Sequence, residues 1–107
     1  MRRGDLVTVA NSGDFGKPRP ALVIQSDLFD QTGSVVLLRL SGTMADLPLF
    51  RLTTEPAPHN GLRKISQVMI DKIITVKREK AGPVFGRLSD DDMLSVTRAL
   101  AVFLGIA

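Results

Sequence analysis

Short apolar runs rich in β-branched residues, separated by turns, occupy most of this chain of 107 residues. Such runs are too short for ordinary helices and are typical of β-strands. Gly- and Pro-rich segments predict loops at 11–16 and 55–61 and a turn at 32–33. The strands predicted from the apolar runs cover residues 6–9, 21–25, 34–40, 49–53, 68–70 and 73–76.

A single convincing helix signal stands near the C-terminus. Ser89 is placed as an N-cap, Asp92 occupies the capping-box position, and three consecutive aspartates face the positive end of the helix dipole. Capping explains these aspartates more simply than a metal site does. Apolar residues then recur at helical spacing up to Gly105, a typical terminator. We therefore expect one domain over 1–107: a small closed sheet plugged or flanked by one helix.

Lys17-Pro18-Arg19-Pro20 stands directly before the apolar run of residues 21–25. Each proline fixes its own φ and pushes its predecessor towards extended backbone, which excludes a helix here. Arg19 is thereby held at the start of a strand. A planar guanidinium fixed in this way suits a phosphate oxyanion. The same pattern also fits an ordinary surface arginine, and the local sequence leaves both interpretations open.

Basic residues outnumber acidic ones by 14 to 11, and the excess is concentrated in one segment. Between residues 63 and 80 only Asp71 and Glu79 oppose a group of six basic side chains. This distribution favours a polyanionic partner such as nucleic acid, although a solvated face of mixed charge fits it as well. The six are Arg63, Lys64, Lys72, Lys77, Arg78 and Lys80.

Composition excludes several classes of function. The chain has no cysteine and one histidine, so disulfides, zinc–thiolate sites and histidine clusters are excluded. No apolar run approaches the roughly 20 residues that span a bilayer. Residues 1–5 contain arginines without the apolar stretch of a signal peptide, so we expect a cytoplasmic protein that does not bind membranes.

The order of these features resembles the MazF/PemK family of toxins from toxin–antitoxin systems, over essentially the entire chain. The resemblance implies a small closed β-barrel of the Src-homology-3 type with a C-terminal helix, and a two-fold homodimer. It also implies cleavage of single-stranded RNA without a metal or cofactor, and an antitoxin whose acidic disordered tail covers the RNA site. The matching segments are Arg3-Gly4-Asp5, Gly16 to Val23, Leu40-Ser41, Ser66-Gln67-Val68, Asp71-Lys72-Ile73, Thr75-Val76, Leu88-Ser89 and the terminal helix.

The resemblance also implies the roles of individual residues. The family's catalytic arginine falls on Arg19 and its catalytic hydroxyl on Ser41, with Thr43 as the alternative hydroxyl and Lys17 as a further candidate. Cleavage in this family uses the ribose 2′-OH as nucleophile, the group that distinguishes RNA from DNA. Because an arginine stays protonated, Arg19 suits stabilisation of phosphate charge better than proton transfer.

Further side chains are candidates for binding RNA. Phe15 can stack on a base, and Lys72 stands where relatives usually carry glutamine, so the cleaved sequence is not predicted. His59 lies in a Pro-rich loop and is interpreted as a solvated side chain rather than an acid or base. Arg51, like Arg39, flanks the strand of Ser41 and either contacts phosphate or faces outward. The candidates are Phe15, Lys17, Arg39, Arg63, Lys64, Lys72 and Lys77.

Two other functions stay open. A gyrase-poisoning toxin like CcdB has the same barrel architecture, and residues 101–107 loosely resemble its C-terminal helix. Under that hypothesis the helix end is the functional surface. A plain RNA-binding module would have the same basic face without cleavage. The segment 17–23 favours the nuclease over the gyrase poison.

Overall fold

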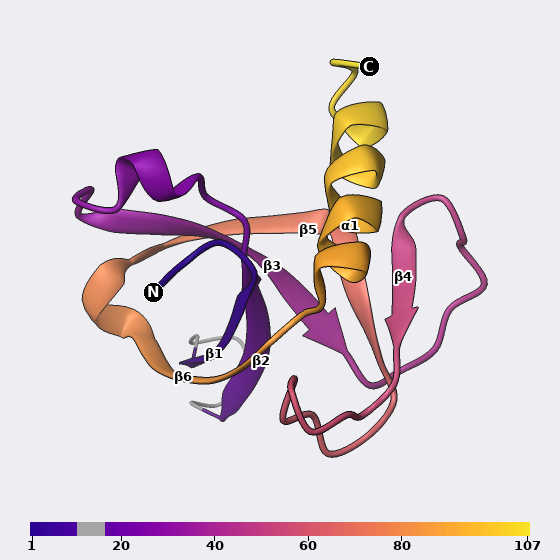
Figure 1. Cartoon of the computed structure of the whole chain (residues 1–107), viewed down its shortest axis with the longest axis horizontal. Coiled ribbons are helices and arrows are strands. Elements are labelled where there is room, and N and C mark those ends of the chain that lie inside the picture. Colours follow the sequence, from indigo (N-terminus) through magenta and orange to yellow (C-terminus); the bar gives the residue numbers. More distant parts are fainter. Residues whose placement is uncertain (11–16) are drawn as a thin grey trace.

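The computed structural model describes residues 1–10 and 17–107, so the predicted loop 11–16 lies outside the described residues. The described residues form one sheet and one α-helix (Figure 1). The elements are β1 (Asp5–Ala10), β2 (Pro18–Val23), η2 (Asp27–Phe29), β3 (Ser34–Ser41), β4 (Arg51–Thr54), β5 (Ser66–Lys77), η3 (Arg78–Lys80), β6 (Ala81–Arg87) and α1 (Asp90–Phe103), of which η2 and η3 are short 3₁₀ helices.

The six strands follow the order β4-β5-β3-β2-β1-β6, and every neighbouring pair is antiparallel. The predicted mainly β fold with a C-terminal helix is confirmed. Its closure differs from the expectation, because in residues 1–10 and 17–107 no ladder joins β4 to β6. Instead the loop after β4 reaches β6, where the Arg87 N–H donates to the His59 carbonyl at 2.9 Å. A loop therefore bridges the gap that a closed barrel would fill with strand pairing.

Two apolar clusters lie on opposite faces of β1, β2 and β3. Because side chains alternate between the two faces along a strand, neighbouring residues belong to different clusters. Leu6, Leu22 and Leu38 pack with Val96 and Leu100 of α1. The second cluster lies on the face away from α1 and consists of Val7, Val9, Ala21, Val23, Val35 and Leu37.

Strand β2 begins three residues earlier than predicted, and both prolines belong to it. Pro18 and Pro20 pair with β1, whereas the ladder with β3 covers only Ala21 to Val23. A proline lacks an N–H, so it is tolerated where a strand has a partner on one side only. Both prolines therefore fit within the strand, although the local sequence predicts that the strand begins after them.

Strand β5 was predicted as two short strands and is one strand of 12 residues. Asp71 and Lys72 interrupt its apolar pattern at a bulge. Between Leu38 and Leu40 of β3, the facing position on β5 moves from Ile73 to Val68. Extra residues on one strand of a pair bend it, so the two halves of β5 serve different parts of the sheet.

Two terminal elements complete the fold. Strand β6, which the sequence pattern misses, contains two glycines and a proline and is placed by its pairing with β1. Helix α1 matches the prediction: the Ser89 hydroxyl accepts the Asp92 N–H at 3.1 Å, and Gly105 follows the end with φ +76°. No helix in the described part of the chain is long and apolar enough to cross a membrane.

Candidate active site

Arg19, Arg39 and Ser41 lie on one face of the sheet, on strands β2 and β3. Ala21 pairs with Arg39 as the last pair of the β2–β3 ladder, and Arg19 and Ser41 each lie two residues beyond that pair on their own strands. Arg19 alternates with Pro20 and so shares the side of Ala21, which packs in the cluster away from α1. Arg19 is exposed, while Arg39 and Ser41 are half-buried. The two residues predicted for catalysis thus lie on neighbouring strands, on the side of the sheet opposite the helix.

The Ser41 hydroxyl organises the turn that follows β3. Its oxygen accepts the Thr43 N–H at 3.0 Å, a local turn of the kind that serine favours. The hydroxyl is therefore held in one place rather than free to rotate with its side chain. Thr43 is exposed and lies beyond the end of the strand. Of the two candidate hydroxyls, Ser41 is the one whose position the fold determines.

Lys64 brings a positive charge to the same turn from a different loop. A Cβ added at Gly42 would lie 2.5 Å from the Lys64 ammonium nitrogen, so this side chain rests against the glycine between Ser41 and Thr43. A Cβ at residue 42 would require the end of the Lys64 side chain to move. The loop after β3 and the loop before β5 therefore meet beside the candidate hydroxyl.

The remaining predicted RNA contacts do not all gather here. Lys77 pairs with Ser34 at the other end of β3, about 23 Å from Ser41 at 3.3 Å per residue. Lys72 lies at the bulge of β5, 3.8 Å from the Asp71 carboxylate. Lys17 and Arg63 are exposed, just before β2 and in the loop before β5 respectively. The candidate Phe15 lies outside the described residues.

Arg51, weighed above as a phosphate contact, is engaged in a different interaction. Its Nε and Nη2 donate to the two Asp71 carboxylate oxygens, each at 3.0 Å, and its side chain is 14% exposed. These hydrogen bonds from Arg51 hold the pKa of Asp71 below its ordinary value. His59 is exposed, and its carbonyl accepts the Arg87 N–H. Arg51 therefore serves the packing of β4 on β5.

Sequence reasoning assigned no role to Gln67, which the structure places directly opposite Ser41 in the β3–β5 ladder. Gln67 is 5% exposed, and its amide bonds the backbone of Ala45. The motif Ser66-Gln67-Val68 marked the segment as part of the family pattern. A polar residue in an otherwise apolar strand was the signal that could have identified it.

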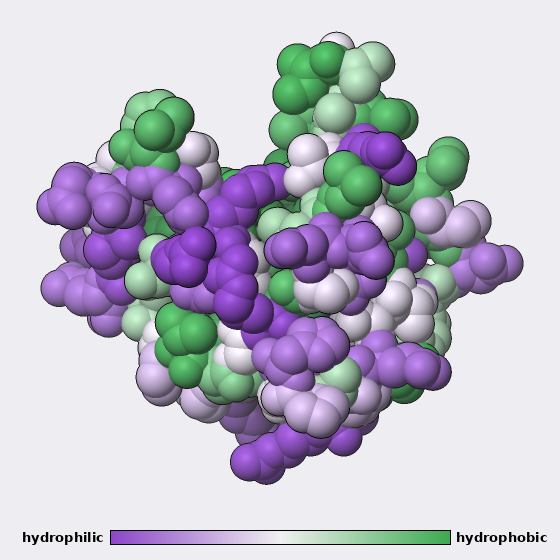
Figure 2. All heavy atoms as spheres, viewed as in Figure 1, coloured by the Kyte–Doolittle hydropathy of each residue, from purple (hydrophilic) through white to green (hydrophobic). Residues whose placement is uncertain are grey.

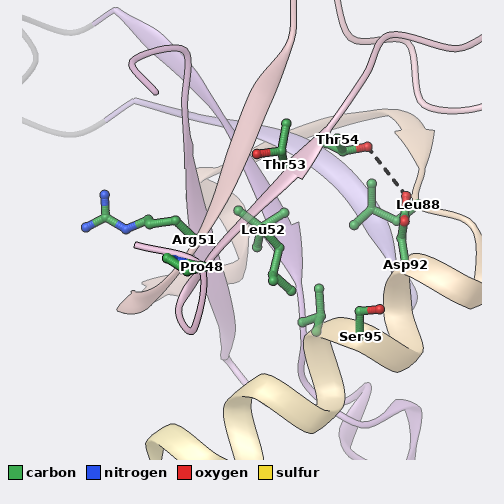
Figure 3. A pocket seen from close by; sticks show the side chains of 10 residues that line it. Pro48, Arg51, Leu52, Thr53, Thr54, Leu88, Asp92 and Ser95 are labelled. Atoms are coloured by element: carbon green, nitrogen blue, oxygen red, sulfur yellow. Dashed lines mark hydrogen bonds between the residues drawn. The ribbon is translucent and has the colours of Figure 1, made fainter. Parts of the chain in front are cut away.

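A separate cleft of about 210 Å³ lies between β4 and α1 (Figure 3). The Thr54 hydroxyl donates to Asp92 at 3.4 Å along one wall, and Ser95 projects from the helix. The Arg51 side chain points away from α1 (Figure 3). Its Nε donates to Asp71 of β5. This cleft is on the helix side of the sheet, so it is distinct from the face that carries Arg19 and Ser41.

Comparison with known proteins identifies the family. The family model described as PemK-like, MazF-like toxin of type II toxin–antitoxin system matches residues 2–104. The chain belongs to this family. A curated MazF-like relative from Mycolicibacterium smegmatis, named probable endoribonuclease MazF, is 49% identical over 108 residues, covering 100% of this chain and 99% of that protein. The predicted membership of the MazF/PemK family is thereby confirmed.

Solved structures share the same fold. An endoribonuclease in complex with its cognate antitoxin, from a mycobacterial species, matches with a TM-score of 0.81 at 23% identity, over 100% of this chain and 97% of that chain. A chain of the MazE–MazF complex from Deinococcus radiodurans matches with a TM-score of 0.79 at 23% identity, again over 100% and 97%. The MazF-like arrangement of sheet and helix is thus common to chains of widely different sequence.

Proposed function

We propose that this toxin is an endoribonuclease that cleaves single-stranded RNA without a metal ion. The observation that supports the proposal is that Arg19, Arg39 and Ser41 belong to one face of the neighbouring strands β2 and β3, near the last pair of their ladder. The Lys64 ammonium against Gly42 adds a further positive charge beside the hydroxyl. Positive charge fixed around a hydroxyl suits a phosphodiester. The name of the 49% identical relative, a probable endoribonuclease, supports the same reaction class.

The chemistry requires the RNA to supply its own nucleophile. The ribose 2′-oxygen attacks phosphorus and loses its proton, the bond from phosphorus to the 5′-oxygen breaks, and the leaving oxygen gains a proton. The products are a 2′,3′-cyclic phosphate and a 5′-hydroxyl. Negative charge on the non-bridging oxygens grows during attack, and the Arg19 guanidinium stabilises it, by about 2.7–4 kcal/mol for one well-placed donor. The Ser41 hydroxyl holds one of these oxygens in place.

The partners follow from the family and the surface. We expect an antitoxin with an acidic tail, because Arg19 and Arg39 lie on the site face and Lys64 approaches Gly42 beside it. The predicted homodimer has a candidate contact in the apolar residues at the free end of α1 (Figure 2). Val102 and Leu104 are 66% and 53% exposed there. Light scattering on the purified chain measures whether two copies associate. We expect the toxin in the cytoplasm, because the proposed RNA substrate is there.

A single incubation tests the activity. Purified protein with EDTA and a long single-stranded RNA should yield discrete fragments that end in a cyclic phosphate. Arg19→Ala should lower the rate about 10²–10³-fold, the usual loss when one oxyanion donor is removed, while its Tm stays near that of the parent because Arg19 is exposed.

The other outcomes are equally informative. Intact RNA with altered mobility would indicate a binding module. Intact RNA together with stalled gyrase would indicate a gyrase poison. Cleavage by Arg19→Ala as fast as by the parent would mean that the arginine has been misassigned.

A further inference from the structure

Gln67 holds the loop that follows Ser41. Its Oε1 accepts the Ala45 N–H and its Nε2 donates to the Ala45 carbonyl, both at 3.0 Å. The Nε2 also donates to the Thr53 hydroxyl at 3.2 Å. The amide thus bonds both the N–H and the C=O of one loop residue, as a neighbouring strand would. Because Gln67 is 5% exposed, its amide has little access to bulk water as an alternative partner.

The residue before it holds the other loop of the site. The Ser66 hydroxyl, on a side chain with 4% exposure, donates to the Lys64 carbonyl at 3.0 Å. The first two residues of β5 therefore bond two loops that are distant in sequence. Those loops meet where the Lys64 ammonium rests against Gly42. The start of β5 therefore positions both the loop after β3 and the loop before β5, which meet beside the candidate Ser41 hydroxyl.

We propose that Gln67 is a positioning residue for RNA cleavage, which holds the Ser41–Thr43 turn at the end of β3 in place. This inference rests on the proposed function. Gln67 does not need to touch RNA: it acts through Ala45, and its backbone faces Ser41 in the β3–β5 ladder. Displacement of a reacting group by about 1 Å can cost on the order of 10²-fold in rate. Removal of the amide should therefore impair the chemical step rather than the binding of RNA.

The chain offers a matched control for this test. Gln25 makes the same kind of amide contact in the loop between β2 and β3, donating to the Phe29 carbonyl at 2.7 Å and accepting the Val36 N–H at 3.2 Å. That loop carries none of the candidate site residues. Gln25→Met and Gln67→Met each replace an amide by an apolar side chain of similar length. Both should lower Tm, but only the second should affect cleavage.

The experiment uses the full chain and a short fluorogenic RNA that spans a site which the parent cleaves. We measure kcat, KM, Tm and the affinity for the same RNA with a 2′-deoxy sugar at the scissile position, which binds but cannot react. Gln67→Met should lower kcat about 10²-fold, with KM and the affinity for the deoxy RNA changed less than about 3-fold. Gln25→Met should leave kcat unchanged.

Other outcomes overturn the inference. A kcat for Gln67→Met equal to that of the parent, or an equal loss of kcat in Gln25→Met, would show that Gln67 supports stability alone. If Gln67→Met does not fold, Gln67→Glu takes its place under the same criteria, because it keeps the acceptor for the Ala45 N–H and loses the donor. If the parent chain cleaves no RNA, the proposed function is overturned together with this inference. If the parent cleaves RNA and the Gln67 variant cleaves it equally fast, only the positioning role is overturned.

Discussion

Arg51 and Asp71 face each other on β4 and β5 through two parallel hydrogen bonds of 3.0 Å. The Arg51 guanidinium also lies 5.7 Å from the centre of the Phe50 ring. Phe50 in turn contacts Phe103 of α1, with ring centres 6.1 Å apart. One line of contacts therefore runs from the bulge of β5 to the end of the helix.

This pair predicts an acid-dependent stability. The Arg51 contact lowers the pKa of the Asp71 carboxyl in the folded chain, with a smaller contribution from Lys72. A lowered folded pKa means that stability is present above the ordinary aspartate value of about 3.9 and is lost as pH falls through the folded value. Asp71→Asn should cost about 1.5–3 kcal/mol at pH 7, as for hydrogen bonds to charged groups. Urea unfolding at pH 7 and in acid checks this.

The control for Asp71 is Asp46→Asn, which changes an exposed aspartate. Its unfolding free energy should match the parent at pH 7. The difference between Asp71→Asn and the parent should shrink as pH falls below the ordinary aspartate pKa. A constant difference over the whole pH range would contradict an electrostatic origin.

Ser41 and Thr43 predict a ranking of two hydroxyl removals. Ser41→Ala should reduce RNA cleavage more than Thr43→Ala, because Ser41 lies on the same face of the sheet as Arg19 and Arg39 and its oxygen also accepts the Thr43 N–H. Initial rates on one RNA, with Tm for each variant, measure the ranking. The reverse order would move the catalytic hydroxyl two residues along the chain.

Gly86 predicts a steric limit on the contact between β6 and the loop after β4. A Cβ at Gly86 would lie 2.1 Å from the Asn60 carbonyl oxygen. Asn60 cannot easily move away, because it is 1% exposed and its side chain is hydrogen-bonded to the backbone of Glu55, Ala57 and Leu62. Gly86→Ala should therefore destabilise the fold by about 2 kcal/mol or more, the scale of core overpacking. Thermal unfolding measures the change.

Gly33→Ala is the matched control, because an added Cβ there meets nothing within 4 Å. Its Tm should equal or slightly exceed that of the parent, since alanine restricts the unfolded chain. Equal Tm values for Gly86→Ala and Gly33→Ala would mean that the loop after β4 accommodates the added methyl group without loss of stability.

Lys64 and Lys77 predict where RNA lies. Lys64 approaches Gly42 beside the site, whereas Lys77 pairs with Ser34 at the far end of β3. Lys64→Ala should weaken binding and reduce the slope of log affinity against log salt by about 0.7, the value for one phosphate contact on a single strand. Lys77→Ala should leave the slope unchanged. Titrations of a 2′-deoxy-substituted RNA at several salt concentrations test both, and equal effects would place RNA along the whole basic segment.

Elements with local signals were predicted well from the sequence. Helix α1 was identified because Ser89 and the aspartates after it act within one turn. Strand β6 was missed because Gly82, Pro83 and Gly86 disfavour strands, and only its pairing with β1 compensates. For the same reason β5 was divided at Asp71, whose charge is satisfied by a partner on another strand. The secondary structure of such segments depends on pairing with strands that are distant in sequence.

The candidate site shows the same division. The flanking prolines make Arg19 a candidate and the family pattern makes Ser41 one, so both follow from sequence alone as predictions. Gln67 has no recognisable local role, since its partners Ala45 and Thr53 are 22 and 14 residues away in sequence. The convergence of Lys64 on Gly42 likewise depends on two loops meeting in space. Contacts between distant segments are what local patterns omit.

The open sheet leaves β4 and β6 as its outer strands, and each is built so that a second molecule cannot extend the ladder. Strand β4 has only four residues, too few to template a long foreign strand. Strand β6 carries Pro83, which has no amide hydrogen to share, and its last residue already bonds His59. We therefore expect newly made copies of this chain to resist edge-to-edge aggregation.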